Sequence, residues 1–189
     1  MKYFKKVIGG KCYLSPINIE DAERYSEWLN NIDITKFLAI THHQISEMKE
    51  KEILTEMIKQ GSQIFAIVDL NTNNLIGNCS LFDINHRKNK AELGIFIGDK
   101  NYLGKGFGTE AIKLILDYGF NILNLHNIML SVYSYNQRAI AAYTKAGFKE
   151  FGRRRDAHTI AGKRYDEIYM DILDDEFESI YFKGIMKEI

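Results

Sequence analysis

The 189-residue sequence has a single proline, two cysteines and no excess of charge, with 25 basic and 25 acidic residues. Two cysteines, Cys12 and Cys79, are too few for a disulfide scaffold and lack metal-ligand spacing. The balanced charge argues against a general nucleic-acid binder, which is usually basic. No stretch reaches the roughly 18 apolar residues of a membrane span, and residues 1–14 lack the apolar run of a signal peptide. We therefore expect a cytoplasmic protein that binds neither nucleic acid nor membranes.

What the composition does contain suits one folded domain. Hydrophobic residues make up 46% and aromatic residues 12% of the chain, which excludes disorder as the main state. No linker rich in proline or serine and no internal repeat divides the sequence. We expect a single domain over residues 1–189, with a core at about 10–173 and a C-terminal tail at 174–189 that forms a helix.

The period of the apolar residues changes along the chain and predicts the secondary structure. Helical spacing predicts helices over 18–31, 45–60, from after Gly108 to 123, and 136–147, with Asn136 and Gly147 as caps of the last. Alternation and turn residues predict strands over 11–17, 63–70, 75–84, 91–98, 127–133, 148–155 and 163–173. Short connections make the first strands an antiparallel meander. The expected fold class is mixed α/β (α+β), with a mostly antiparallel sheet of six to seven strands flanked by helices.

Three glycines, Gly104, Gly106 and Gly108, separate a predicted strand from a predicted helix. A helix N-terminus has unpaired N–H groups and attracts anions, glycines let a phosphate approach closely, and Lys105 adds a cation. The spacing does not match a Rossmann loop, and a Walker loop is absent. Taken alone, the loop fits a phosphate cradle or a helix entry whose glycines only relieve tight packing.

Several motifs in order make the chain resemble the GNAT acetyltransferase superfamily over residues 10–173. The stretch from Asn101 to Gly106 is similar to that family's pyrophosphate loop, [RQ]-x-x-G-x-[GA]. AELGIFI precedes the loop, GTEAIKLILDYGF follows it, and NQRAIAAYTKAGFKEFG resembles a second family segment. LSPINIEDAERYSEWLNN resembles the branch of ribosomal-protein N-terminal and spermidine acetyltransferases. Asn101 departs from the pattern, which removes one side-chain contact to the cofactor's phosphates.

The resemblance implies the GNAT fold and transfer of an acetyl group from acetyl-CoA to an amine. It implies that N–H groups from Leu103 to Thr109 hold the pyrophosphate. It also implies that strands 95–97 and 127–133 splay apart to admit the pantetheine arm, which Asn136 contacts. The cofactor-binding residues expected on this basis are Ile95, Phe96, Ile97, Leu103, Gly104, Lys105, Gly106, Phe107, Gly108, Thr109, Asn136 and Tyr143.

Two residues are candidates for the chemistry. Tyr143 falls at the family's acid position and is expected to stabilise the leaving thiolate; the alternative is a core tyrosine. Glu92 is expected to act as base or amine anchor; the alternative is a solvated glutamate paired with Lys90 or Arg87. No metal is expected.

The acceptor stays open between a polyamine, another small-molecule amine and a peptide N-terminus. A homodimer or higher homo-oligomer is implied by analogy. A non-catalytic acyl-CoA-binding module and a nucleotide-binding protein are the alternative functions.

Overall fold

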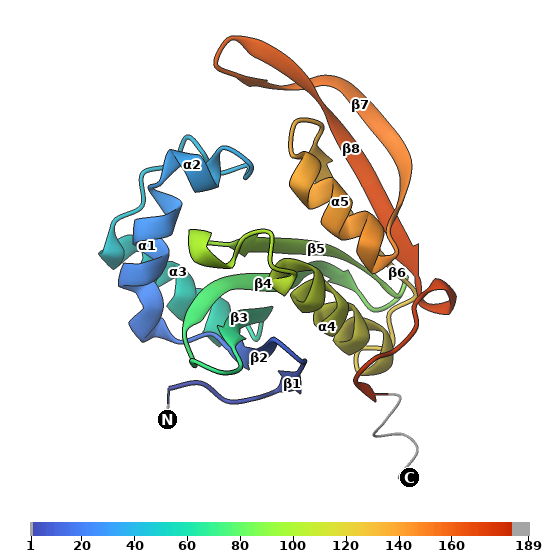
Figure 1. Cartoon of the computed structure of the whole chain (residues 1–189), viewed down its shortest axis with the longest axis horizontal. Coiled ribbons are helices and arrows are strands. Elements are labelled where there is room, and N and C mark those ends of the chain that lie inside the picture. Colours follow the sequence, from blue (N-terminus) through green and yellow to red (C-terminus); the bar gives the residue numbers. More distant parts are fainter. Residues whose placement is uncertain (1, 183–189) are drawn as a thin grey trace.

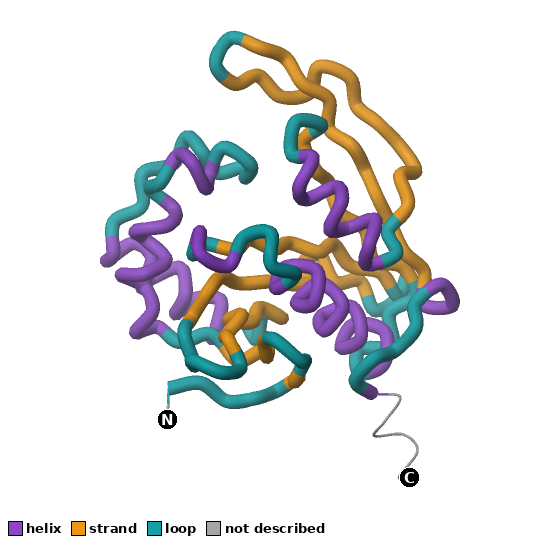
Figure 2. Tube along the Cα trace, viewed as in Figure 1, coloured by secondary structure: helices purple, strands orange, loops and turns teal. Residues whose placement is uncertain are grey.

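A computed structural model describes residues 2–182, which form one sheet covered by helices (Figures 1 and 2). The strands within this range are β1 (Val7–Ile8), β2 (Cys12–Pro16), β3 (Gln63–Asp69), β4 (Leu75–Asn85), β5 (Lys90–Ile97), β6 (Asn127–Tyr133), β7 (Lys149–Ile160) and β8 (Lys163–Leu173). The α-helices are α1 (Ala22–Leu29), α2 (Ile32–Thr35), α3 (Glu47–Lys59), α4 (Phe107–Asn121) and α5 (Gln137–Ala146). Three 3-10 turns are η1 (Ile19–Asp21), η2 (Lys100–Tyr102) and η3 (Asp174–Glu176).

The strand order across the sheet is β1-β2-β3-β4-β5-β6-β8-β7. Of the described pairs, β5–β6 is parallel and the others are antiparallel. The mixed, mostly antiparallel sheet is therefore confirmed. Eight strands are described where six to seven were expected, because β1 was missed. A strand of two residues is too short to show an alternating pattern of apolar and polar side chains.

The helices cover both faces of the sheet, as the sequence predicts. Alternate residues of β2 and β3 enter two separate apolar clusters, since successive strand side chains point to opposite faces. Leu14 and Ile67 belong to the cluster built around α4, whereas Tyr13 and Val68 belong to the cluster that contains α1 and α3 residues. The alternation of side chains along the strands therefore places one set of apolar residues against α4 and the other set against α1 and α3.

The C-terminal part corrects two expectations. The last hairpin is longer than predicted, because the segment AHTI continues β7 and only Ala161 and Gly162 form the turn. Both turn residues have positive φ, 49° and 73°, which suits a two-residue hairpin turn. The helix predicted over 174–189 is wrong for residues 174–181, where only η3 forms; residues 183–189 lie outside the described part.

Asp117, on α4, holds the segment after η3. Its side chain is fully buried. It accepts hydrogen bonds from Asn121 Nδ2 at 2.7 Å, from Ser179 Oγ at 2.8 Å, and from the N–H groups of Ile180 and Tyr181 at 3.0 and 2.7 Å. These donors satisfy a carboxylate that would otherwise be costly to bury. The N–H groups of residues 180–181 therefore bond to a side chain and not to the carbonyls of residues 176–177, as a helix through this segment would require.

Candidate active site

The two parallel strands at the centre of the sheet pair over only three residues each. Lys90, Ala91 and Glu92 of β5 pair with residues 127–129 of β6, and the pairing stops there. Beyond Glu92 the strands separate, as the family resemblance implies. A cavity of about 780 Å³ lies along this gap, lined by residues of β4, β5, the glycine loop, α4, β6, α5 and β8 and of the segment after α1. The separated strands thus supply a deep site in the middle of the sheet.

The glycine loop forms one wall of this cavity. Gly104 and Gly106 have positive φ, 71° and 88°, and Gly106 caps α4 without a side-chain hydrogen bond. Within residues 2–182, the N–H groups of residues 104–109 donate no hydrogen bond, whereas the Leu103 N–H already donates to Lys100 O at 3.2 Å. No atom lies within 4 Å of a Cβ built on Gly104. Free amides, an uncapped helix and open space fit a phosphate group.

Most of the predicted cofactor residues come together here. The cavity is lined by Ile95, Phe96, Ile97, Leu103, Gly104, Gly106, Gly108, Thr109, Asn136 and Tyr143. Two expected residues do not line it. Lys105 is exposed, and the Phe107 ring packs edge-on against Tyr102 with centroids 4.9 Å apart. The backbone of these two residues still belongs to the loop.

Asn136 and Tyr143 reach the cavity from α5. Asn136 Oδ1 accepts the Ala139 N–H at 3.2 Å and caps the helix, as predicted, which leaves its amide NH₂ as a donor. Gly147, with φ of 109°, ends the helix as predicted. Tyr143 is 8% exposed, and its hydroxyl has no hydrogen-bond partner among residues 2–182. Burial raises the pKa of Tyr143 to about 12, so the hydroxyl keeps its proton at neutral pH.

Glu92 stands at the point where β5 and β6 separate. It is half-buried, and no ion pair to Lys90 or Arg87 is found within the described chain. Burial raises the pKa of its carboxyl, and the charges of Asp83 and Glu167 raise the pKa further. Two carboxylates, Glu92 and Glu167, therefore make this end of the cavity acidic, and the charge of exposed Asp83 adds to their field.

Glu167 and Arg138 line the same cavity and were missed by the sequence reasoning. Glu167 lies on β8, whose alternation separates buried Ile168 from its neighbours, but the pattern does not say which strand lies next to β8. The Arg138 guanidinium lies 5.7 Å from the Phe37 ring centroid. Glu167 lines the same cavity as Glu92 because β8 lies beside β6, and Arg138 lines it from α5.

The segment after α2 closes the far side of the cavity. The rings of Phe37 and Tyr135 lie 5.8 Å apart, and the Tyr135 hydroxyl donates to the Lys36 carbonyl. Lys100 binds Asp33 across the same side at 3.0 Å. In Figure 1, α2 faces α5 across the opening. The residues of α2 and of the segment after it thus line this end of the cavity.

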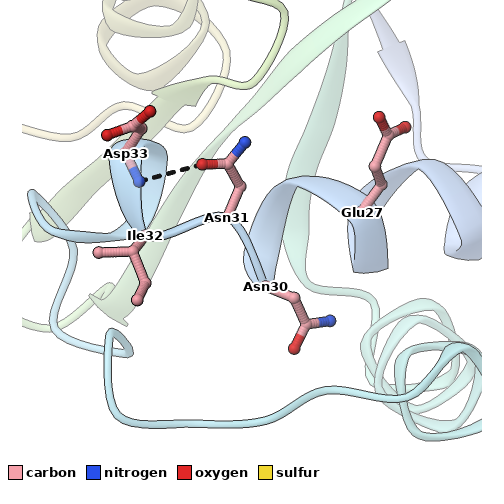
Figure 3. Close-up of a pocket in the computed structure, with 5 residues that line it drawn as sticks. All are labelled: Glu27, Asn30, Asn31, Ile32 and Asp33. Atoms are coloured by element: carbon pink, nitrogen blue, oxygen red, sulfur yellow. Dashed lines mark hydrogen bonds between the residues drawn. The ribbon is translucent and has the colours of Figure 1, made fainter.

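A second, open depression lies between α1 and α2 (Figure 3). Its polar groups already serve the local fold. Asn31 Oδ1 accepts the Asp33 N–H at 3.0 Å as a helix cap, and Asn30 Nδ2 donates to Ser26 O and Ile45 O. We assign this surface a structural role.

Two further features bear on binding. Among residues 2–182, no three histidine, cysteine or carboxylate side chains are grouped to hold a metal ion. None of the helices in that range combines the length and the hydrophobicity that crossing a membrane requires.

A family model described as an acetyltransferase (GNAT) domain matches residues 11–149. The chain belongs to the GNAT acetyltransferase family. It is therefore an N-acetyltransferase that depends on acetyl-CoA. The expected superfamily and the expected fold are both confirmed.

Individual GNAT relatives are similar over most of the chain. A spermidine N(1)-acetyltransferase of Vibrio cholerae serotype O1 is 35% identical over 127 residues, 67% of this chain and 73% of that protein. An uncharacterized N-acetyltransferase, p20, of Bacillus licheniformis is 28% identical over 167 residues, 87% of this chain and 93% of that protein. A crystal structure of spermidine N-acetyltransferase from Vibrio cholerae in complex with CoA and spermine has a TM-score of 0.80 and 30% identity, covering 89% of this chain and 98% of that one.

Proposed function

We propose that this GNAT enzyme acetylates a primary amine by direct attack of the amine on the thioester, inside the cavity between β5 and β6. One observation carries the proposal: an uncapped anion-binding loop, a protonated tyrosine and a half-buried glutamate line the same cavity. A binding module without chemistry would not need the last two.

The chain offers donors along the whole length of a CoA molecule. The free N–H groups of residues 104–109 would hold the pyrophosphate. The unpaired edge of β5 at residues 95–97 and the Asn136 amide NH₂ would hold the pantetheine arm. The bound cosubstrate supplies the acetyl thioester.

Glu92 is the proposed base that removes a proton from the acceptor amine. A primary amine with a pKa of ~10.4 is protonated at pH 7, and deprotonation costs roughly 4.6 kcal/mol. The raised pKa of Glu92 makes it a stronger base than an ordinary glutamate. We propose that Glu92 receives the proton from the amine, directly or through water, after the acidic site has bound the ammonium.

Tyr143 is the proposed hydrogen-bond donor to the leaving thiolate of CoA. A thiol of pKa ~8.5 is a stronger acid than the Tyr143 hydroxyl, so complete proton transfer from tyrosine to thiolate is uphill. A hydrogen bond from the hydroxyl to the developing thiolate requires no such transfer and stabilises the charge where it forms. The unpartnered hydroxyl of this buried residue, which lines the cavity, suits that role.

The acceptor that fits best is a small amine with more than one positive charge. Glu92 and Glu167 line one end of the cavity, the charge of Asp83 acts on Glu92 from outside it, and together they would attract a cation. A polyamine carries such charges, and the relatives named as spermidine acetyltransferases agree with this choice. A peptide N-terminus, with one charge, is the second candidate. The cytoplasmic location and the homodimer stay predictions.

The test is thiol release from acetyl-CoA against spermidine, spermine, amino sugars, aminoglycosides, amino acids and short peptides. Polyamines should stimulate release most, and Glu167→Gln should raise KM for spermidine more than KM for a monoamine. Equal stimulation by all monoamines would contradict the acidic-site argument. If no amine of the panel stimulates thiol release while calorimetry still shows CoA binding, the non-catalytic binding module would be favoured.

A further inference from the structure

The free amides of the glycine loop leave open which side chains neutralise a bound phosphate. Asn101 lies in η2, is exposed and does not line the cavity. Lys100 is paired with Asp33 at 3.0 Å, and Arg24 is paired with Glu27 at 2.7 Å and Asp99 at 3.5 Å. Lys100 and Arg24 are therefore committed to carboxylates, and Lys105 of the loop itself is exposed and does not line the cavity.

Lys11 reaches the loop from the hairpin between β1 and β2. Its Cε lies 3.5 Å from the point that a Cβ on Gly106 would occupy. Its Nζ lies 5.9 Å from the ring centroid of Phe107, the first residue of α4. No ion pair of Lys11 is present in residues 2–182. An unpaired ammonium therefore lies beside the uncapped helix end.

Glu110 fixes the position of this lysine. Its carboxylate accepts the N–H groups of Gly10, Lys11 and Cys12 at 3.0, 2.7 and 2.9 Å. The approach requires a glycine before them, because a Cβ on Gly9 would lie 2.8 Å from Glu110 Cδ. Three donated hydrogen bonds also offset a negative charge that would otherwise repel a phosphate. Glu110 is thus a positioning residue, because it holds the backbone of the hairpin so that the Lys11 side chain lies beside the glycine loop.

We infer that Lys11 contacts a phosphate group of CoA at the glycine loop and supplies the long cationic side chain that Asn101 does not. This rests on the proposed function only in placing CoA in that loop. The chemistry is ammonium to phosphate, and the phosphate is either the pyrophosphate or the 3′-phosphate. The hairpin, which lies outside the cavity lining, thereby becomes part of cosubstrate recognition.

The test is calorimetric titration of the full chain with CoA and with dephospho-CoA, for the wild type, Lys11→Met and Lys11→Arg. Lys5→Met is the matched control, because Lys5 lies just before β1 and its Nζ also lies over a ring, 5.4 Å from the centroid of Tyr13 on β2. Lys11→Met should weaken CoA binding about tenfold, and the loss should shrink at high salt. Lys11→Arg should restore most of the affinity, and Lys5→Met should bind as the wild type does.

The two ligands identify the phosphate. A loss with CoA that is absent with dephospho-CoA assigns Lys11 to the 3′-phosphate, and an equal loss with both assigns it to the pyrophosphate. Unchanged CoA affinity in Lys11→Met, with wild-type binding intact, overturns the inference and leaves the proposed function standing. Wild-type protein that binds no CoA overturns both. Thermal unfolding of each variant shows whether a loss of affinity reflects a loss of fold.

Discussion

Glu50 allows a quantitative prediction about stability. It lies on α3, is 4% exposed and has no ion pair among residues 2–182. Burial raises the pKa of its carboxyl from 4.5 to about 7. The folded state therefore binds the Glu50 proton more tightly than the unfolded state does. This contribution to stability is complete below pH 4.5 and is lost as the pH rises to 7.

The magnitude follows from the two pKa values. A rise from 4.5 to about 7 corresponds to at most about 3 kcal/mol. Water that reaches the edge of the carboxylate reduces this to about 1–2 kcal/mol. Glu50→Gln removes the charge and keeps the shape. We expect it to stabilise the protein by that amount at pH 8, or about 3–6 °C in Tm, and to change little at pH 4.5.

The assay is thermal and urea unfolding of the wild type and Glu50→Gln at both pH values. Glu52→Gln is the control, since Glu52 is exposed on the same helix and should shift stability by less than about 0.5 kcal/mol. A Glu50→Gln variant that is destabilised at pH 8, or that gains equally at both pH values, would refute the reasoning. The first result would show that the folded protein holds Glu50 as a stabilised anion, and the second would show that the effect of the substitution does not depend on ionisation.

Three further predictions concern the active site and its support. Tyr143→Phe should lower kcat at least tenfold with little change in CoA affinity, and unchanged steady-state turnover would remove the tyrosine from the mechanism. Because the pKa of Glu92 is raised, kcat/KM should fall with decreasing pH through a value above 4.5; the same acid limb in Glu92→Gln would exclude Glu92 as its source. Gly98→Ala places a Cβ 2.1 Å from Trp28 Cδ2, which should cost about 1–3 kcal/mol in urea unfolding; wild-type stability would show that α1 shifts freely.

Local signals made much of the site predictable. The Asn136 cap, the Gly147 stop and the glycine loop each depend on residues within one turn of the element that they define. The separation of β5 and β6 came from the family resemblance, because no local pattern says where strand pairing ends.

Contacts between distant segments were not predictable in this way. Glu167 reaches the cavity only because β8 lies beside β6, and Lys11 reaches the loop only because Glu110 binds the hairpin. The tail was misassigned for a related reason. The spacing of Phe177, Ile180 and Tyr181 is helical, but Asp117 takes two of the backbone N–H groups of this segment.

Asp117 also affects where the chain can be shortened. The family match ends at residue 149, and the last strand ends at Leu173, yet the buried carboxylate takes three of its four closest donors from residues 179–181. A chain truncated after Leu173 keeps every strand and the whole cavity but leaves Asp117 with Asn121 alone. An under-bonded buried carboxylate costs several kcal/mol or takes up a proton. The unit that folds stably is therefore longer than the segment that the family model matches.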